Sequence, residues 1–149
     1  MEPYTIDIAS EDGTEVDAEL VEETLVFTLD HLGIGPCEVS VSFVSDEAIR
    51  RLNDRYRSLD EPTDVLSFPQ EEEGESFGPV RILGDIVISL DTMERNALVF
   101  DVEPPIELRR LLIHGVLHLL GRDHATNEER EEMLLLQEKI LGHLLRSEY

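Results

Sequence analysis

The segment from His114 to His124 constrains the fold of this 149-residue chain more than any other part of the sequence. An α-helix advances about 100° per residue, so His114 and His118 lie on one helix face, one turn apart. His124 follows six residues later and can join the pair only if the helix ends and the chain turns back. Gly121 stands where a left-handed residue at the end of a helix would produce this turn. We therefore expect a helix that presents two histidines and then reverses direction.

Three imidazoles at this spacing indicate a metal site, and we predict that His114, His118 and His124 bind one zinc ion per chain. Three neutral histidines leave a fourth position for water, as in catalytic zinc sites, whereas structural sites more often use cysteines and four protein ligands. Nickel, cobalt and copper also accept imidazole ligands. Asp123 precedes one predicted ligand, and we expect it to orient a histidine rather than to transfer protons.

The histidine spacing is also similar to that of the metzincin peptidases, in which a glycine follows the second histidine by three residues. Those peptidases carry a glutamate directly after the first histidine, and this glutamate is the general base. Gly115 occupies that position here. The similarity therefore predicts a metzincin-like metal helix, while a peptidase would lack its base and is kept only as a degenerate alternative.

The rest of the chain alternates between strand-like and helix-like patterns without a repeat or a linker, which predicts one domain over residues 1–149. Alternating apolar residues and short apolar runs predict four strands, at residues 4–8, 39–43, 65–68 and 81–89. Apolar stripes and capping residues predict five helices, at about residues 18–32, 46–56, 91–100, 106–120 and from 127 onward. In the second helix, Ile49, Leu52 and Tyr56 are expected on the inner face. This mixed order predicts an α+β fold with a mixed sheet of roughly four strands packed with about five helices.

The composition is strongly acidic, with 34 acidic against 12 basic residues and a net charge of −22. Such a charge keeps a protein soluble and repels polyanions and anionic membranes at low salt. The longest apolar runs are far shorter than the ~20 residues that span a bilayer, so we expect no membrane association. The single cysteine, Cys37, and the lack of a signal-like N-terminal segment are typical of a cytoplasmic protein.

Three motifs together resemble the YbeY family of bacterial endoribonucleases over nearly the whole chain. The first is the histidine segment, His-Gly-x-Leu-His-Leu-x-Gly-x-Asp-His from His114 to His124. The second combines Leu-Asn-x-x-Tyr-Arg, ending at Arg57, with Pro-Thr-Asp-Val-Leu-Ser-Phe-Pro at 62–69. The third is Leu-Gly-Asp-Ile-Val-Ile at 83–88. The motifs follow the family's order with similar separations.

The resemblance implies a zinc-dependent endoribonuclease that cleaves single-stranded RNA. It further implies a role in maturation of the 3′ end of small-subunit (16S) ribosomal RNA and in ribosome quality control. The implied partners are ribosomal RNA and the ribosome or ribosome-associated proteins. By the match, the three histidines are the metal ligands and Arg57 is the functionally important arginine, in contact with the phosphate in the transition state. A ribosome-assembly factor with a purely structural metal is the non-enzymatic alternative.

Seven arginines are expected in the helix before residue 58 and around the histidine helix. If these two helices border one cleft, the cleft would be locally positive on an acidic body and could guide a phosphate backbone. The arginines are Arg50, Arg51, Arg55, Arg57, Arg109, Arg110 and Arg122. Few aromatic residues accompany them, so we expect little sequence-specific reading of bases.

Overall fold

The computed structural model describes residues 3–11, 14–70, 80–121 and 127–147, which form four strands and five helices. The strands are β1 (Tyr4–Ser10), β2 (Cys37–Val44), β3 (Val65–Pro69) and β4 (Arg81–Ser89). The helices are α1 (Ala18–His31), α2 (Asp46–Arg57), α3 (Leu90–Phe100), α4 (Pro104–Leu119) and α5 (Asn127–Ser147). The predicted α+β class, with its mixed four-stranded sheet and five helices, is confirmed. Within the described ranges, no helix is both long and apolar enough to cross a membrane.

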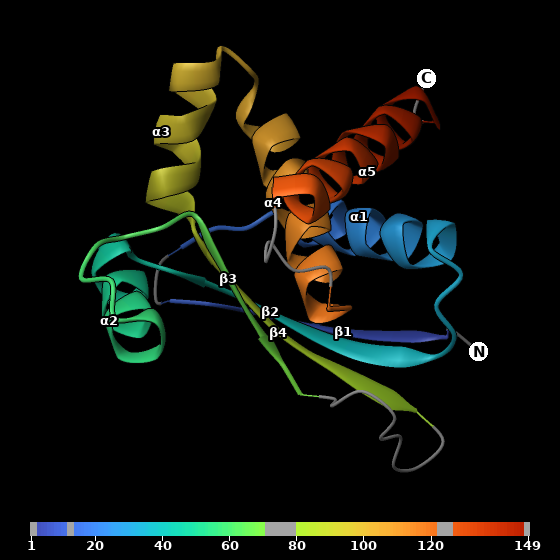
Figure 1. The fold of residues 1–149 in the computed structure, drawn as a ribbon, viewed down its shortest axis with the longest axis horizontal. Helices are drawn as coiled ribbons and strands as arrows, with labels where there is room; N and C mark the ends of the chain where they lie inside the picture. Colours follow the sequence, from blue (N-terminus) through green and yellow to red (C-terminus); the bar gives the residue numbers. More distant parts are fainter. Residues whose placement is uncertain (1–2, 12–13, 71–79, 122–126, 148–149) are drawn as a thin grey trace.

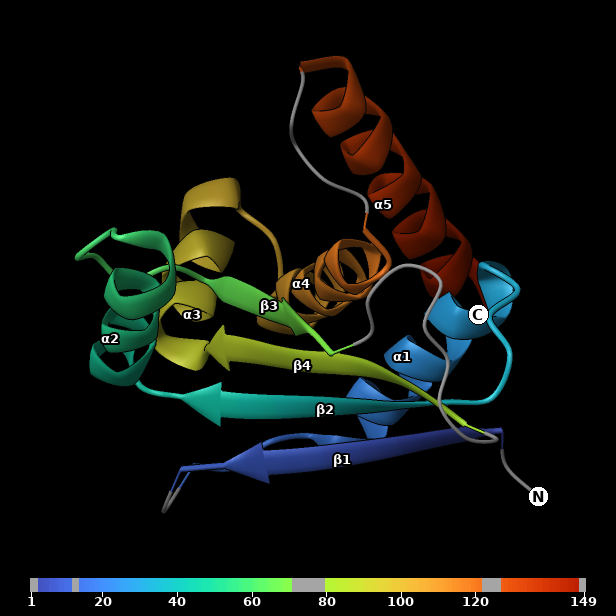
Figure 2. The same cartoon turned by 60° about the horizontal axis from the view of Figure 1, so that its bottom comes forward.

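The strands form one sheet in the order β1-β2-β4-β3. β1, β2 and β4 run parallel, with Ile6 opposite Val39 and Val41 opposite Ile86. β3 pairs antiparallel with β4, with Leu66 opposite Val87, and therefore forms an edge of the sheet. Figure 2 shows α2 and α3 beside the ends of β2 and β4, the strands that they follow in the chain.

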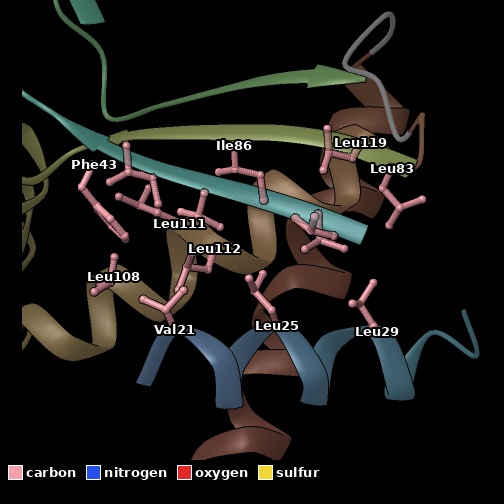
Figure 3. Packing of buried hydrophobic residues seen from close by; sticks show 14 of the residues in the cluster. Val21, Leu25, Leu29, Phe43, Leu83, Ile86, Leu108, Leu111, Leu112 and Leu119 are labelled. Carbon is pink, nitrogen blue, oxygen red and sulfur yellow. The ribbon is translucent and has the colours of Figure 1, made fainter. Parts of the chain in front are cut away.

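The helices cover the two sheet faces unequally, and the larger core lies between the sheet and helices α1 and α4 (Figure 1). Figure 3 shows Val21, Leu25 and Leu29 of α1 facing α4 and the strands. The opposite face carries a smaller cluster built on Ile49 of α2 and Val87 of β4. A third cluster joins α4 to α5. Helix α4 is therefore packed against the sheet, α1 and α5 at once.

The starts of three helices, α1, α2 and α4, show which local signals are reliable. The Asp17 carboxylate accepts a hydrogen bond from the Leu20 N–H at 3.1 Å, and Ser45 Oγ accepts one from the Ala48 N–H at 3.2 Å. Both are N-cap contacts, as the capping residues predict. The expected start of α4 was wrong by two residues, because Pro104 already lies in the helix. The first turn of a helix needs no N–H hydrogen bond, so proline is accepted there.

The inner face predicted for α2 is correct only in part. Ile49 is fully buried, whereas Tyr56 is 57% exposed. Tyr56 falls in the last turn of α2, where its ring meets the Phe68 ring of β3 edge-on at 5.1 Å and the Arg55 guanidinium carbon lies 5.4 Å from its centroid. A regular apolar stripe predicts a helix face, but it does not predict how deeply each residue of that face is buried.

Helix α4 packs tightly against β4 at Gly115. A Cβ atom built on Gly115 would lie 2.9 Å from Cγ2 and 3.0 Å from Cδ1 of Ile86, whose side chain is fully buried. Close-packed interiors do not accept such contacts without moving the neighbour. Only glycine at position 115 therefore allows the helix to lie at its observed distance from the sheet.

We predict that Gly115→Ala destabilises the protein, although alanine is the better helix former. Overpacking should cost about 1–3 kcal/mol, which outweighs the helix-propensity gain of up to ~1 kcal/mol. Gly142→Ala in α5 is the matched control, since a Cβ there would meet only the flexible Arg146 side chain at 3.4 Å. The control should raise the free energy of unfolding, measured by urea denaturation, by up to ~1 kcal/mol. Equal effects of the two substitutions would contradict the close approach of α4 to β4.

Candidate active site

A cleft of about 330 Å³ opens where α4 runs along the edge strand β3. It is lined by residues from the end of α2, the following loop, β3 and α4, namely Arg57, Thr63, Asp64, Val65, Leu66, Ser67, His114 and His118. Ser67 Oγ donates a hydrogen bond of 3.2 Å to the Gly115 carbonyl and so ties β3 to α4 inside the cleft. The fold thus brings together Arg57 and the two histidines, which the sequence separates by more than fifty residues.

The two histidines of α4 lie as the helix period predicts. The ring centroids of His114 and His118 are 4.6 Å apart with an angle of 55° between the rings, and both side chains are half-buried. The helix ends at Leu119, and Gly121 adopts φ = +81°, which confirms the predicted left-handed turn. The rings therefore stand close enough to bind one small cation together.

The other predicted metal-site residues, Asp123 and His124, lie outside the described residues. In the ranges that the structure describes, no three histidine, cysteine, aspartate or glutamate side chains converge as a metal site. The predicted zinc site therefore depends on His124 as its third ligand. The donor set that is described, two neighbouring imidazoles on one helix turn, fits zinc.

A glutamine that the sequence analysis did not select determines the tautomer of His114. Gln137 of α5 is 5% exposed, and its Oε1 lies 2.6 Å from His114 Nδ1. The Gln137 amide nitrogen donates to the Glu138 carboxylate at 3.1 Å, which fixes the amide oxygen toward the histidine. An amide oxygen only accepts hydrogen bonds, so Nδ1 carries the proton and Nε2 carries the lone pair that a metal requires.

An ion-pair network holds Glu138 in place. Arg110 of α4 contacts Glu138 at 2.9 Å and Glu107 at 2.8 Å. Burial raises the pKa of the Glu107 carboxyl, although the ion pair with Arg110 acts to lower it. The network therefore links α4 to the same turn of α5 that carries Gln137. The sequence signal for Gln137 was a single polar residue on the buried stripe of α5, between Met133 and Leu141.

Arg57 is the last residue of α2, and its side chain is exposed at the cleft. Ser58 then adopts a left-handed conformation with φ = +57°, which ends the helix and directs the chain toward β3. No carboxylate of the described ranges lies within 4 Å of Arg57, so its guanidinium faces the cleft without a described ion pair.

The predicted cluster of arginines does not make the cleft broadly positive. Arg50 pairs with Asp60 at 2.7 Å, and Arg51 pairs with Glu47 at 3.0 Å. The Arg110 side chain is held by two glutamates, and Arg109 is 9% exposed and does not line the cleft. Arg122 lies outside the described residues. Of the seven arginines, Arg57 is the one with a described position in the cleft.

Asp64 shapes the loop before β3 through hydrogen bonds of its carboxylate. Asp64 Oδ1 accepts a hydrogen bond from the Val65 N–H at 2.8 Å and one from Thr63 Oγ1 at 3.4 Å. Its Oδ2 accepts a hydrogen bond from Asn96 Nδ2 of α3 at 3.1 Å. The carboxylate is therefore engaged in holding the loop that forms one wall of the cleft.

Asp46, at the start of α2, fixes this helix to α3. It accepts hydrogen bonds from the hydroxyls of Ser89 at 2.6 Å and Thr92 at 2.7 Å, and it pairs with Arg95 at 2.8 Å. Burial acts to raise the pKa of the Asp46 carboxyl, but the hydrogen bonds and the guanidinium outweigh it and hold the pKa below its ordinary value. The charged form of Asp46 is therefore favoured in the folded state.

We predict that Asp46→Asn lowers the free energy of unfolding by about 1–2 kcal/mol at neutral pH. A lowered carboxyl pKa contributes stability that is present above the unfolded pKa, near 4, and is lost as the pH falls. The difference between Asp46→Asn and the parent protein should therefore shrink below about pH 4 in urea denaturation. The exposed carboxylate control, Glu22→Gln, should change stability by less than about 0.5 kcal/mol at either pH. A difference that is independent of pH would contradict the assigned role.

Fold and cleft together define a class of protein: an α+β domain in which a helix with two histidines lies along the edge strand of a mixed sheet. A family model described as Endoribonuclease YbeY matches residues 6–145. The chain belongs to this family, and the resemblance derived from its motifs is confirmed.

Curated relatives and a solved structure agree with this assignment. Endoribonuclease YbeY of Treponema denticola is 44% identical over 85% of this chain and 83% of its own length. The protein of the same name from Bacillus subtilis is 43% identical over 91% of this chain and 92% of its own length. The solution structure of TM1509 from Thermotoga maritima is similar with a TM-score of 0.66 and 32% identity, over 96% of this chain and 91% of that one.

Proposed function

We propose that this protein is a zinc-dependent endoribonuclease, specific for single-stranded RNA, that matures the 3′ end of 16S ribosomal RNA. We further propose that it serves ribosome quality control in the cytoplasm, with the ribosome or ribosome-associated proteins as partners. The name of the family and of its curated members supports cleavage of RNA. The single observation that carries the proposal is that Arg57, His114 and His118 line one cleft.

His114, His118 and His124 would hold the zinc ion, with one ion per chain. When bound, zinc supplies positive charge that polarises a phosphoryl oxygen and lowers the pKa of water. Gln137 holds the ring of His114 through Nδ1, so that Nε2 would be the nitrogen available to the metal, a common way in which proteins orient metal-binding histidines. Asp123 is proposed to orient a neighbouring histidine in the same manner.

Arg57 is proposed to bind the scissile phosphate. Its planar guanidinium donates two parallel hydrogen bonds to two phosphate oxygens, and it stabilises the charge that develops on them in the transition state. No described carboxylate within 4 Å competes for the side chain. The helix C-terminus behind it adds a favourable dipole for the cation itself.

The dimensions of the cleft support a preference for single strands. Its volume of about 330 Å³ is near the lower end of the range for small-molecule pockets. A nucleotide unit that is free of its neighbours fits such a space better than a base-paired duplex, whose bases are stacked inside the helix.

The structure argues against the peptidase alternative. The general base of a metzincin would have to replace Gly115, where even a single added carbon atom collides with Ile86. The position after the first histidine therefore faces the sheet, and a glutamate would not fit there without moving the helix.

We predict that metal-replete protein cleaves single-stranded RNA and leaves duplex RNA intact, and that His114→Ala abolishes the cleavage. Arg57→Ala should lower the cleavage rate by about 10²–10³-fold, because a stabilising donor to the transition state is lost. The matched control is Arg51→Ala, on the same helix but 73% exposed in its side chain and outside the cleft lining. Rates are measured on a labelled oligonucleotide, with folding checked by circular dichroism.

Other outcomes of this experiment distinguish the alternatives. Equal loss of activity in Arg51→Ala would mean a general effect of charge rather than a site at Arg57. The absence of cleavage in all samples, combined with unfolding when the metal is chelated, would support a ribosome-assembly factor with a structural metal. Persistent cleavage in His114→Ala would refute the proposed site.

We predict that Gln137→Leu weakens zinc binding about 10–100-fold, because His114 loses the acceptor that fixes its tautomer. Gln70→Leu is the control, since Gln70 bonds to Asp85 at 3.0 Å and does not line the cleft. Affinities are measured by competition with a chromophoric chelator. Identical zinc affinities for the two variants would show that Gln137 does not act on the metal site.

A further inference from the structure

Tyr56 is a large aromatic side chain left exposed beside the cleft. It is 57% exposed, and it directly precedes the cleft residue Arg57 in the chain. Its ring meets the Phe68 ring edge-on at 5.1 Å, with 66° between the planes. Phe68 belongs to the cluster on the α2 face of the sheet, so Tyr56 lies outside the cleft lining, one residue from Arg57 at the end of α2.

The contacts of Tyr56 orient its ring without burying it. The guanidinium carbon of Arg55 lies 5.4 Å from the centroid of the Tyr56 ring, within the range of a cation–π contact. Together with the contact from Phe68, this leaves more than half of the tyrosine surface in solvent. A ring held in one orientation with an exposed surface is a suitable platform for stacking.

Cationic groups flank this ring along α2. Arg50 and Arg51, in the middle of the helix, are paired with carboxylates, at 2.7 and 3.0 Å. Arg55 and Arg57, on either side of Tyr56, have no carboxylate within 4 Å among the residues that the structure describes. In an acidic chain, the end of α2 thus combines an exposed ring with two guanidinium groups that can meet phosphates.

We propose that Tyr56 stacks on a nucleobase of the single-stranded RNA whose phosphate enters the cleft at Arg57. Arg55 lies over the Tyr56 ring and adds positive charge for the neighbouring backbone. This inference rests on the proposed function and deepens it by naming the residue that binds a base. Stacking on an aromatic ring accepts every base, because each base has a π-face, so the contact selects unpaired strands rather than a sequence. A base inside a duplex is not accessible to such a ring.

The test compares two single-stranded RNAs of equal length, one complete and one abasic, in which the sugar-phosphate backbone lacks its bases. Binding to metal-replete protein is measured by fluorescence anisotropy before cleavage sets in. Tyr56→Leu should bind the complete RNA roughly 5- to 150-fold more weakly than the parent protein and the abasic RNA equally well. Tyr56→Phe, which keeps the ring, should bind both RNAs as the parent protein does.

The matched control is Phe100→Leu, which removes an aromatic ring that is 61% exposed on α3, away from the cleft. It should bind both RNAs as the parent protein does. Unchanged binding of the complete RNA by Tyr56→Leu, or an equal loss on both RNAs, would overturn the stacking role. If the parent protein binds and cleaves RNA while Tyr56→Leu is unaffected, only this inference fails. If the parent protein neither binds nor cleaves RNA, the proposed function fails first.

Discussion

The close packing of α4 on β4 is the constraint on which the site depends. Gly115 lets the helix backbone approach Ile86, and Ser67 of the edge strand bonds to the Gly115 carbonyl. Because the histidines precede and follow Gly115 on the same helix, this contact also determines their position relative to the sheet edge. A larger residue at position 115 would push the helix outward and change the width of the cleft as well as the stability of the fold.

Polar contacts then fix what the packing brings together. Gln137 of α5 holds His114 in one tautomer, and Glu138 orients the Gln137 amide. Arg110 of α4 in turn pairs with both Glu138 and Glu107. Asp46 at the start of α2 binds Ser89, Thr92 and Arg95 at the start of α3. These contacts fix α2, the helix that ends at Arg57. Each side of the cleft is thus held by its own buried or half-buried network. The rigid placement of reacting groups is what metal and phosphate chemistry requires.

The acidity of the chain and its affinity for RNA are compatible because charge is distributed locally. Most described arginines near the cleft are neutralised by carboxylates at 2.7–3.0 Å, so the net charge of −22 is not reversed over a broad surface. The exceptions, Arg55 and Arg57, lie together at the end of α2. In the proposed function, these two guanidinium groups and the Tyr56 ring would contact one or two nucleotides, whereas a long duplex would meet the acidic remainder of the surface.

The helices and strands and the pairing of the histidines could be predicted from the sequence, because both follow from the fixed period of helices and strands. His114 and His118 must share a face of any helix that contains them, and Gly121 was recognisable as its end. The residues that complete the site were decided only by tertiary structure. The order β1-β2-β4-β3 places β3 at the edge, and this brings Arg57 to the histidines. Only the packing of α5 on α4 brings Gln137 to His114, and only the tertiary structure shows that Tyr56 stays exposed on the face where Ile49 is buried. The spacing of residues within one element predicts the geometry of that element. Contacts between distant segments depend on which surfaces the whole chain buries.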